Sequence, residues 1–432
     1  MSELKGVREV YRGCAGDATV RTVLFVSNGY GEDTIAASIV EQLLDMLNPP
    51  RVLAMPLVGE GRAYARLGVE VVGPRRLMPS GGLVLAGWSN ILTDLRAGFW
   101  KMTSDQMATL KSLRKHLGAL VAVGDSYPVL MGALCARQPV IMVGTAKSNY
   151  FYPYSAFERA VFRRYCEIVF ARDEPTALTL GEHGIRARWV GNAMMDSLGM
   201  TAHPLPLTSN AICVGLLPGS RKVAYRDLPV ILDAARRLGA ERPAEFVMAL
   251  PDSLSARDFA GAARAYGWEW LPFEGRAATE MSEGVDGVLV GYDQRILLVR
   301  GRFGDVIKHC ALIIGQAGTG NEQAAGMGKP VVAFDSDGRR EPGWYRARQK
   351  GLLGDSLSVV ERAGEAIARE ALEILGNPDR YRSMQQAGFD RMGPAGASQK
   401  IASYITEQIQ IRASSVPCFA SVSSAAAESS GG

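Results

Sequence analysis

Short runs of apolar residues recur along the chain, separated by longer stretches in which apolar residues fall about 3.6 positions apart. The runs Thr22–Ser27, Leu120–Val123 and Ile212–Leu217 are uncharged and rich in valine, leucine and isoleucine. Such runs are typical of strands buried on both faces of a parallel sheet. The stretch 33–47 instead places its isoleucines and leucines on one helical face, and Pro49-Pro50 ends it. This alternation of strand and helix predicts an α/β protein.

The remaining apolar runs and periodic stretches predict further elements. Strands are expected at 22–27, 52–56, 69–72, 120–123, 139–143, 168–171, 187–190, 212–217, 246–250, 311–314 and 331–334, and a hairpin at 288–298. Helices are expected at 33–47, 59–67, 103–116, from 173, at 227–238, 361–375 and 378–392, and finally up to 411. Asp33 is the expected N-cap of the first helix.

The strand–helix pattern restarts after residue 200, which indicates two domains. A chain of 432 residues has room for two domains of ordinary size, and the Pro-containing stretch 201–206 is a credible linker. We therefore divide the chain into a flexible N-terminus (1–20), a first α/β domain (21–200), a second one (207–398), a last helix (399–412) and a Ser/Ala/Gly-rich, disordered tail (413–432).

Composition narrows the class of protein. With 47% hydrophobic residues, 21% charged residues and a net charge of +4, the chain has the composition of a soluble globular protein and not of a nucleic-acid binder. Its six cysteines form no C-x-x-C pair and its four histidines are scattered, so we expect buried thiols and no metal site. We find no signal peptide and no apolar run long enough to cross a bilayer. The D-x-D at 335–337 follows a strand, and we interpret it as a turn.

A glycine-rich loop lies between the apolar runs 311–314 and 331–334. It contains Gly315, Gly318 and Gly320, and a helix is expected to begin near Asn321 and Glu322. Glycines let backbone N–H groups approach a ligand, and a helix N-terminus adds partial positive charge, so the loop fits a phosphate. Glu322 could accept hydrogen bonds from sugar hydroxyls. The alternative is an ordinary strand-to-helix turn.

Acidic residues follow two strands of the first domain. Asp125 comes directly after the run 120–123, where ligands of open α/β sheets bind, and it could serve as a general base or merely as a helix cap. Glu32 and Asp33 follow the first strand, as helix-terminal residues or as contacts to a substrate. Arg221, after the strand 212–217, could clamp a diphosphate.

Aromatic residues gather in two places. Between 83 and 100 two tryptophans and a phenylalanine lie among leucines, with Arg96 and Lys101 nearby. This stretch is either a surface that dips into a membrane interface or a helix covering the sheet. The cluster 149–154 could form a lid or a wall for an acceptor.

Three motifs together resemble the lipid-A-disaccharide synthase family: L-L-P-G-S-R at 216–221, G-Q-A-G-T-G-N-E at 315–322 and W-V-G-N-A-M-M-D at 189–196. Their order and spacing match across roughly 22–410. The resemblance implies a GT-B fold, in which two Rossmann-like domains face a cleft and the C-terminal helix crosses back to the N-terminal domain. It favours membrane contact for 83–100, and a location on the inner face of the cytoplasmic membrane of a bacterium.

The resemblance also assigns residues. Asp125 would be the catalytic base, with Glu32 and Asp33 beside the acceptor. The donor site would comprise Ser220, Arg221, Gly318, Thr319, Gly320, Asn321 and Glu322, with Ser220 and Arg221 on the diphosphate and Glu322 on the ribose. No metal and no cofactor other than the UDP-sugar donor is implied.

The implied reaction is transfer of an N-acylated glucosamine-type sugar from a UDP-sugar to a lipid or lipid-monosaccharide phosphate, with inversion and without a metal. Departures from the family leave alternatives open. The first motif reads G-Y-G-E-D instead of G-E-A-S-G-D, no second acid follows Asp125 within 128–131, and Gln316 stands where the family has a Ser-Gly start. The alternatives are a UDP-sugar 2-epimerase, a transferase with another acceptor, and a non-catalytic nucleotide-sugar binder.

Overall fold

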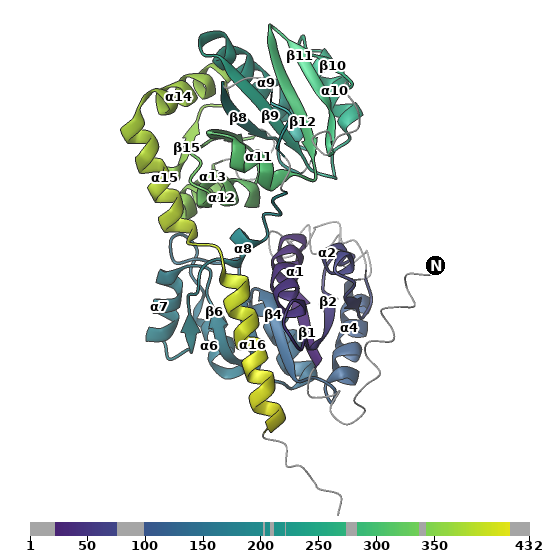
Figure 1. Ribbon diagram of the computed structural model, residues 1–432. Coiled ribbons are helices and arrows are strands. Elements are labelled where there is room, and N and C mark those ends of the chain that lie inside the picture. Colours follow the sequence, from purple (N-terminus) through teal and green to yellow (C-terminus); the bar gives the residue numbers. More distant parts are fainter. Residues whose placement is uncertain are drawn as a thin grey trace, which may run out of the picture.

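The computed structural model describes residues 22–75, 99–201, 204–207, 211–220, 222–273, 283–336 and 343–414, and these form two α/β domains, one above the other in Figure 1. Arg221, the stretch 83–98 and the segments 1–21 and 415–432 lie outside the described residues. Within the described part of the chain, no helix is both long enough and apolar enough to cross a membrane.

The first domain is built on a seven-stranded sheet in the order β3-β2-β1-β4-β5-β6-β7. Every pairing in it is parallel. The strands are β1 (Thr22–Ser27), β2 (Arg51–Pro56), β3 (Glu70–Val71), β4 (Ala119–Gly124), β5 (Val140–Gly144), β6 (Cys166–Phe170) and β7 (Ala187–Arg188). All residues of β1 and β4 are buried, as their uncharged sequences predict.

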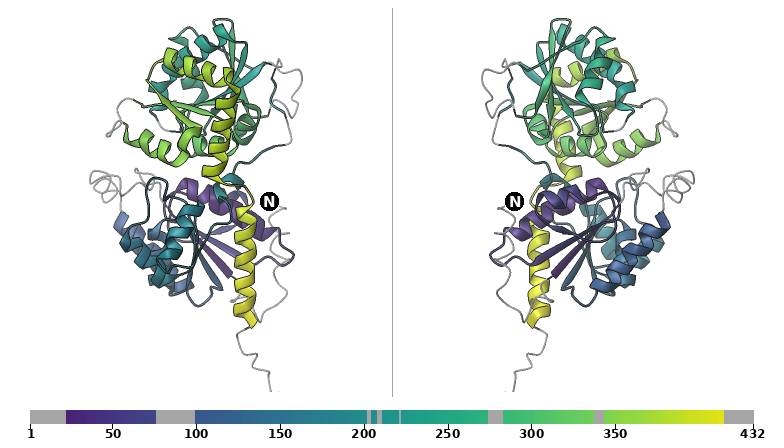
Figure 2. Two further views of the ribbon diagram at one scale, coloured as in Figure 1. Left: turned by 90° about the vertical axis from the view of Figure 1, so that its left-hand side faces the viewer. Right: turned by 90° about the vertical axis from the view of Figure 1, so that its right-hand side faces the viewer.

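Helices cover both faces of this sheet (Figure 2). They are α1 (Tyr30–Leu44), α2 (Arg62–Arg66), α4 (Phe99–Leu113), α5 (Ser126–Met131), the π-helix η2 (Gly132–Ala136), α6 (Ala156–Tyr165), α7 (Glu174–Glu182) and α8 (Ala193–Asp196). Two core clusters result, one on each side of the strands. The polar ends of the strands are therefore the part of the sheet that remains open to a ligand.

The second domain is built on an eight-stranded sheet in the order β10-β11-β12-β9-β8-β13-β14-β15. Its strands are β8 (Ile212–Leu217), β9 (Ala244–Leu250), β10 (Glu269–Leu271), β11 (Val285–Gly291), β12 (Gln294–Arg300), β13 (Leu312–Gly315), β14 (Val331–Phe334) and β15 (Leu357–Val360). The predicted hairpin is confirmed as the antiparallel pair β11–β12. From β12 through β15 the sheet is parallel.

The helices of this half are α9 (Ala224–Glu241), α10 (Ala256–Arg264), α11 (Phe303–His309), α12 (Thr319–Gly326), α13 (Trp344–Leu353), the 3-10 helix η4 (Gly354–Ser356), α14 (Gly364–Gly376), α15 (Pro378–Met392) and α16 (Ala397–Ser414). Helices α12 and α13 lie at the end of the second domain that faces the first (Figure 1). The loops that precede them consequently face the first domain.

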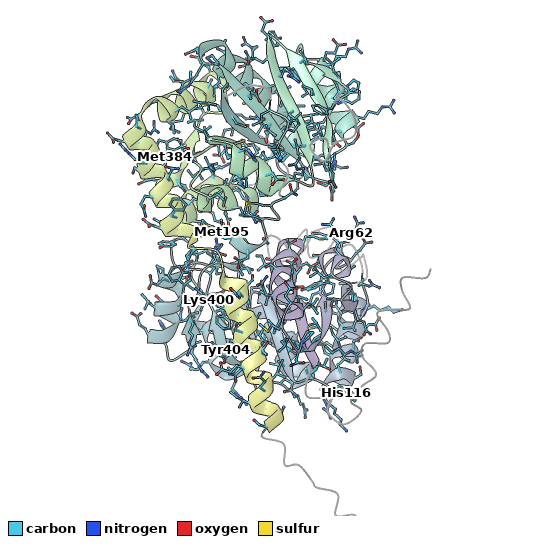
Figure 3. The ribbon with its side chains drawn as sticks, viewed as in Figure 1. Arg62, His116, Met195, Met384, Lys400 and Tyr404 are labelled. Atoms are coloured by element: carbon cyan, nitrogen blue, oxygen red, sulfur yellow. The ribbon has the colours of Figure 1, made fainter. Side chains whose placement is uncertain are left out.

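The last helix, α16, leaves the second domain and packs along the first, as the resemblance implied (Figure 1). The carboxylate of Asp196 accepts hydrogen bonds from the backbone N–H groups of Gly396 (2.5 Å) and Ser398 (2.7 Å) and so caps the N-terminus of α16. Tyr404, which Figure 3 places against the first domain, packs edge-on against Phe170 with ring centroids 5.4 Å apart. The predicted GT-B fold class, with its returning helix, is confirmed.

Several details of the prediction were wrong or incomplete, and α10, α13 and β15 were not predicted. Helix α1 begins at Tyr30, so its N-cap is Gly29 and not Asp33, because the turn after β1 consists only of Asn28 and Gly29. Helix α6 was also not predicted, although Val161 and Phe162 bury one face of it within an otherwise largely polar sequence. It begins with a capping box in which Ser155 and Glu158 bond each other's backbone N–H.

We predict that Asp196→Ala lowers the free energy of unfolding by about 1–3 kcal/mol, because two backbone N–H groups at the start of α16 lose a charged acceptor. Guanidinium denaturation followed by circular dichroism measures this. Asp355→Ala is the control: it removes an exposed ion pair with Lys350, which is worth about 0–1 kcal/mol. Equal stability of both variants would contradict the role of Asp196.

Candidate active site

The candidate site lies where the carboxyl edge of one sheet faces that of the other. From the first domain it includes the residues that follow β1, β4, β5 and β6, and from the second domain the loop between β13 and α12. Side chains join the two edges: Arg172 pairs with Glu322, and Arg348 donates to the carbonyl of Ala146 at 3.2 Å. Figure 3 shows Met195 in the same boundary.

Asp125 follows β4 and serves as the N-cap of α5. Its carboxylate accepts a hydrogen bond from the backbone N–H of Tyr127 at 2.8 Å. Burial raises the pKa of Asp125, although the Tyr127 amide and the Asn28 side chain favour its charged form. Asp125 is therefore a helix cap. Its carboxylate lies at the edge of the sheet and has an increased proton affinity.

Glu32 lies in the first turn of α1, close to Asp125. The hydroxyl of Thr145 donates to its Oε1 at 3.4 Å. Burial raises the pKa of Glu32, and the negative charges of Asp125 and Glu322 raise it further. The structure therefore brings three of the predicted site residues together, from both domains, into one acidic cluster.

Asp33 is not part of this cluster. It is 2% exposed, and the hydroxyl of Ser27 donates to it at 2.6 Å, while Ser27 Oγ lies 2.7 Å from the hydroxyl of Tyr64. Burial raises the pKa of Asp33 to about 7, the Glu32 charge adds to the increase, and the Ser27 hydrogen bond opposes it. Its carboxyl group points into a buried network between β1, α1 and α2.

The loop between β13 and α12 has backbone groups available for a ligand. Helix α12 starts at Thr319, and its N-cap, Gly318, provides no side-chain cap. A side chain at position 318 would come within 2.6 Å of the hydroxyl of Tyr345. Within the described residues, the N–H groups of Thr319 and Gly320 have no hydrogen-bond partner. These groups and the helix dipole can bind an anion.

Buried amides hold this loop in place. The side chain of Gln349 in α13 donates to the carbonyls of Ala317 and Gly318, each at 3.1 Å. Asn321 is fully buried and donates to the carbonyl of Gly315 at 2.9 Å and to Gln349 at 3.2 Å. Asn321, predicted as a ligand contact, is thus located beneath the loop, where it braces the backbone.

The loop that follows β8 lies against the glycine-rich loop. Gly219 has a φ of 86°, and a side chain there would come within 3.2 Å of the carbonyl oxygen of Gln316. Ser220 is exposed, and its carbonyl accepts a hydrogen bond from the hydroxyl of Ser253 at 2.7 Å. The positions of Gly219 and Ser220 bring the two predicted diphosphate loops side by side.

The most prominent site residue that the sequence analysis missed is Arg172, two positions after the end of β6. Its Nη1 donates to the carbonyl of Thr145 at 3.1 Å, and its Nη2 donates to Oε2 of Glu322 at 3.0 Å. The signal was present: A-R-D-E-P follows a buried strand directly, so an arginine stands at the same sheet edge as Asp125. Glu322 itself faces the first domain through this pair.

Thiols and acids of the described residues do not form a metal site. No group of three or more His, Cys, Asp or Glu side chains is placed to hold an ion there. The sulfur atoms of Cys213 and Cys310 lie 3.2 Å apart in the interior of the second domain, where burial raises the pKa of Cys310. The residue Asp337 lies outside the described part of the chain.

Sequence comparison finds remote relatives. The chain is 24% identical over 253 residues to a lipid-A-disaccharide synthase of Trichlorobacter lovleyi, a match that covers 52% of this chain and 58% of that enzyme. It is 27% identical over 240 residues to a lipid-A-disaccharide synthase of Nitrosococcus oceani, covering 51% and 53%. The chain spans about half the length of the curated relatives it matches. No family model matches the chain.

Structure comparison extends over most of the chain. MurG of Acinetobacter baumannii matches with a TM-score of 0.54 at 16% identity, covering 90% of this chain and 99% of that one. The UDP-GlcNAc 2-epimerase of Neisseria meningitidis, bound to UDP-GlcNAc, matches with a TM-score of 0.53 at 14% identity, covering 90% and 100%. The glycotransferase of kitacinnamycin matches with a TM-score of 0.57 at 13% identity, and the match covers 90% of this chain and 99% of that one.

At these identities the structural likeness shows the fold: two parallel-sheet α/β domains of the GT-B type. The sequence relatives are remote and add a similarity to lipid-A-disaccharide synthases over half of the chain. These relatives and neighbours are enzymes, which supports the expectation that this chain is one.

We predict that the free energy of unfolding decreases as the pH rises from about 4 to about 7, and that Asp33 is the cause. Its folded-state pKa of about 7 exceeds the ordinary value of 3.8 for an aspartate, so in this window the folded chain holds a proton that the unfolded chain has lost. Denaturant unfolding at several pH values measures this. As the pH rises, the free energy of unfolding of Asp33→Asn should increase relative to that of the wild type, by up to about 4 kcal/mol.

The control for Asp33→Asn is Asp379→Asn, whose side chain is 92% exposed. This substitution should leave the pH dependence of unfolding unchanged. A constant difference between the wild type and Asp33→Asn from pH 4 to pH 7 would contradict the buried protonation of Asp33.

Proposed function

We propose that the chain is a UDP-sugar-dependent glycosyltransferase of the lipid-A-disaccharide-synthase kind. It would transfer an N-acylated glucosamine-type sugar, as in UDP-2,3-diacylglucosamine, to a lipid or lipid-monosaccharide phosphate. The observation that carries this proposal is the meeting of two sheet edges, with Asp125 and Glu32 on one and the α12 N-terminus on the other. The remote sequence relatives support the same reaction.

The second domain supplies the proposed donor site. The N–H groups of Thr319 and Gly320 would receive the diphosphate, with the positive end of the α12 dipole behind them. Ser220 belongs to the neighbouring loop, and Arg221, which follows it in the sequence, would add a guanidinium to the same phosphates. Glu322 would accept hydrogen bonds from the ribose hydroxyls.

The first domain supplies the proposed base. Asp125 would take the proton of an acceptor hydroxyl while the oxygen of that hydroxyl forms a bond to the sugar C1. At the same time the bond from C1 to the diphosphate oxygen would break. The departing UDP keeps the bonding electrons, and the α12 N-terminus stabilises its negative charge. Because attack and departure lie on opposite sides of C1, the configuration inverts. A carboxylate with a raised pKa holds the transferred proton better than a solvated one.

Acceptor and location belong to the same proposal. A lipid acceptor requires contact with a membrane surface, and the aromatic stretch 83–100 is the proposed contact, with the enzyme peripheral on the inner face of the cytoplasmic membrane. Helix α4 starts at Phe99, within the last two residues of this stretch. The aromatic cluster 149–154 would lie beside the acceptor, since Lys147, whose charge acts on Asp125, is 4.3 Å from the ring centroid of Tyr152.

The proposal predicts a disaccharide product. Purified protein would be incubated with UDP-2,3-diacylglucosamine and the lipid monosaccharide phosphate in the presence of EDTA, and the products analysed by mass spectrometry. Equal amounts of disaccharide and UDP would support the reaction and its independence of a metal. Conversion of UDP-GlcNAc to its 2-epimer without any lipid would contradict it and indicate an epimerase.

The same assay tests the base. Asp125→Asn should lower kcat by about 10²–10⁴-fold, the usual contribution of a general base. Glu182→Gln, at an exposed carboxylate in α7, is the control and should keep the wild-type rate. An unchanged rate in Asp125→Asn together with a lost rate in Glu32→Gln would transfer the role of the base to Glu32.

A further inference from the structure

Arg172 is a buried arginine that joins the two domains at the candidate site. The residue is 6% exposed although it carries a permanent charge. Its guanidinium reaches in two directions: Nη1 donates to the carbonyl of Thr145 at 3.1 Å, and Nη2 donates to Oε2 of Glu322 at 3.0 Å. The first contact fixes the guanidinium to the sheet of its own domain, and the second reaches the first turn of α12 in the other domain.

Burial makes this pair sensitive to the loss of either member. The side chains of Arg172 and Glu322 are 5% and 14% exposed. Removing one partner of such a pair leaves an uncompensated charge in a poorly hydrated place, which is costly. The position of the Glu322 carboxylate therefore depends on Arg172.

The contact leaves part of the carboxylate free. Among the described residues, Arg172 is the only hydrogen-bond donor to Glu322, and it engages Oε2 alone. An ionised carboxylate has about four lone-pair positions, so Oε1 keeps the capacity to accept hydrogen bonds from a ligand. A planar guanidinium anchored at a second point sets the direction in which that oxygen faces.

The surroundings connect this pair to the proposed base region. Thr145 accepts the Nη1 hydrogen bond through its carbonyl, while its hydroxyl donates to Glu32. Near the pair lie Glu32 from α1, the hydroxyl of Tyr154, and the sulfur of Met392 from α15, the latter 3.9 Å from Nη2. Arg172 thus lies between an acid of the acceptor side and an acid of the donor side.

We propose that Arg172 is a positioning residue of the donor site, which holds the Glu322 carboxylate so that its free oxygen receives the 2′-hydroxyl of a uridine nucleotide. This inference rests on the proposed function, because it takes the ribose of UDP as the ligand of Glu322. It adds that the donor site is incomplete without a residue of the first domain. Recognition of the ribose is then coupled to the contact between the domains.

The test compares the binding of UDP with that of 2′-deoxy-UDP by isothermal titration calorimetry. The wild type should bind UDP about 10–100-fold more tightly than 2′-deoxy-UDP, the usual range for a hydrogen bond to a charged group. Arg172→Met should weaken the binding of UDP by about that factor and leave the binding of 2′-deoxy-UDP nearly unchanged, so that the preference for UDP disappears. Glu322→Gln should behave similarly, and the double variant should lose nothing more.

The matched control is Arg348→Met. Arg348 also crosses the domain boundary, through a hydrogen bond to the carbonyl of Ala146 at 3.2 Å, but it does not contact Glu322. It should retain the preference for UDP. Arg172→Lys keeps the charge without the planar fork and should retain part of the preference. If Arg172→Met does not fold by circular dichroism, Arg172→Lys and Glu322→Gln provide the test.

The outcomes separate this inference from the proposed function. A wild-type protein that binds neither nucleotide contradicts the proposed function and the inference with it. A wild-type protein that binds UDP without preference over 2′-deoxy-UDP overturns the inference alone. An equal loss of affinity for both nucleotides in Arg172→Met also overturns it, since a purely structural role would weaken both.

Discussion

A strand that is buried on both faces can present polar groups only at its ends, and this constraint determines where chemistry can occur in the molecule. The strands β1, β4, β13 and β14 are fully buried, and helices cover their sheets on both sides. The loops at the carboxyl ends are therefore the places where carboxylates, glycine backbone and an arginine can meet a ligand. Because α16 returns to the first domain, the two sheet edges are held facing each other.

The domain boundary holds a cluster of acidic side chains next to positive charge. Glu32, Asp125 and Glu322 bring negative charge together, and burial raises the pKa of the first two. Arg172 introduces a positive charge into the cluster, and the α12 N-terminus adds a partial one beside it. Transfer of a sugar from a nucleotide to a hydroxyl requires a base for the hydroxyl proton and positive charge for the departing phosphate. The acidic cluster can supply the base, and the α12 N-terminus can supply the positive charge.

The parts of the fold governed by local sequence could be predicted. The strand Ile212–Leu217 coincides with β8, the hairpin is where its two apolar runs placed it, and the glycine-rich loop leads into α12 as its composition indicated. The order of three motifs led to the GT-B class. Each of these inferences uses residues that are neighbours along the chain.

The parts governed by distant contacts could not be predicted. Arg172 and Glu322 are 150 positions apart, and the Asp196 cap reaches α16 over 200 positions, so neither pairing leaves a periodic signal. The direction of the Asp33 side chain depends on Ser27 and Tyr64, which only the folded α1–α2 packing brings together.

A crystal structure of the protein with bound UDP would show whether the facing sheet edges form a nucleotide-sugar site. We expect the diphosphate on the backbone N–H groups of Thr319 and Gly320, and the ribose within hydrogen-bonding distance of Glu322, beside Arg172. UDP bound at another place, with the N-terminus of α12 free of phosphate, would contradict it.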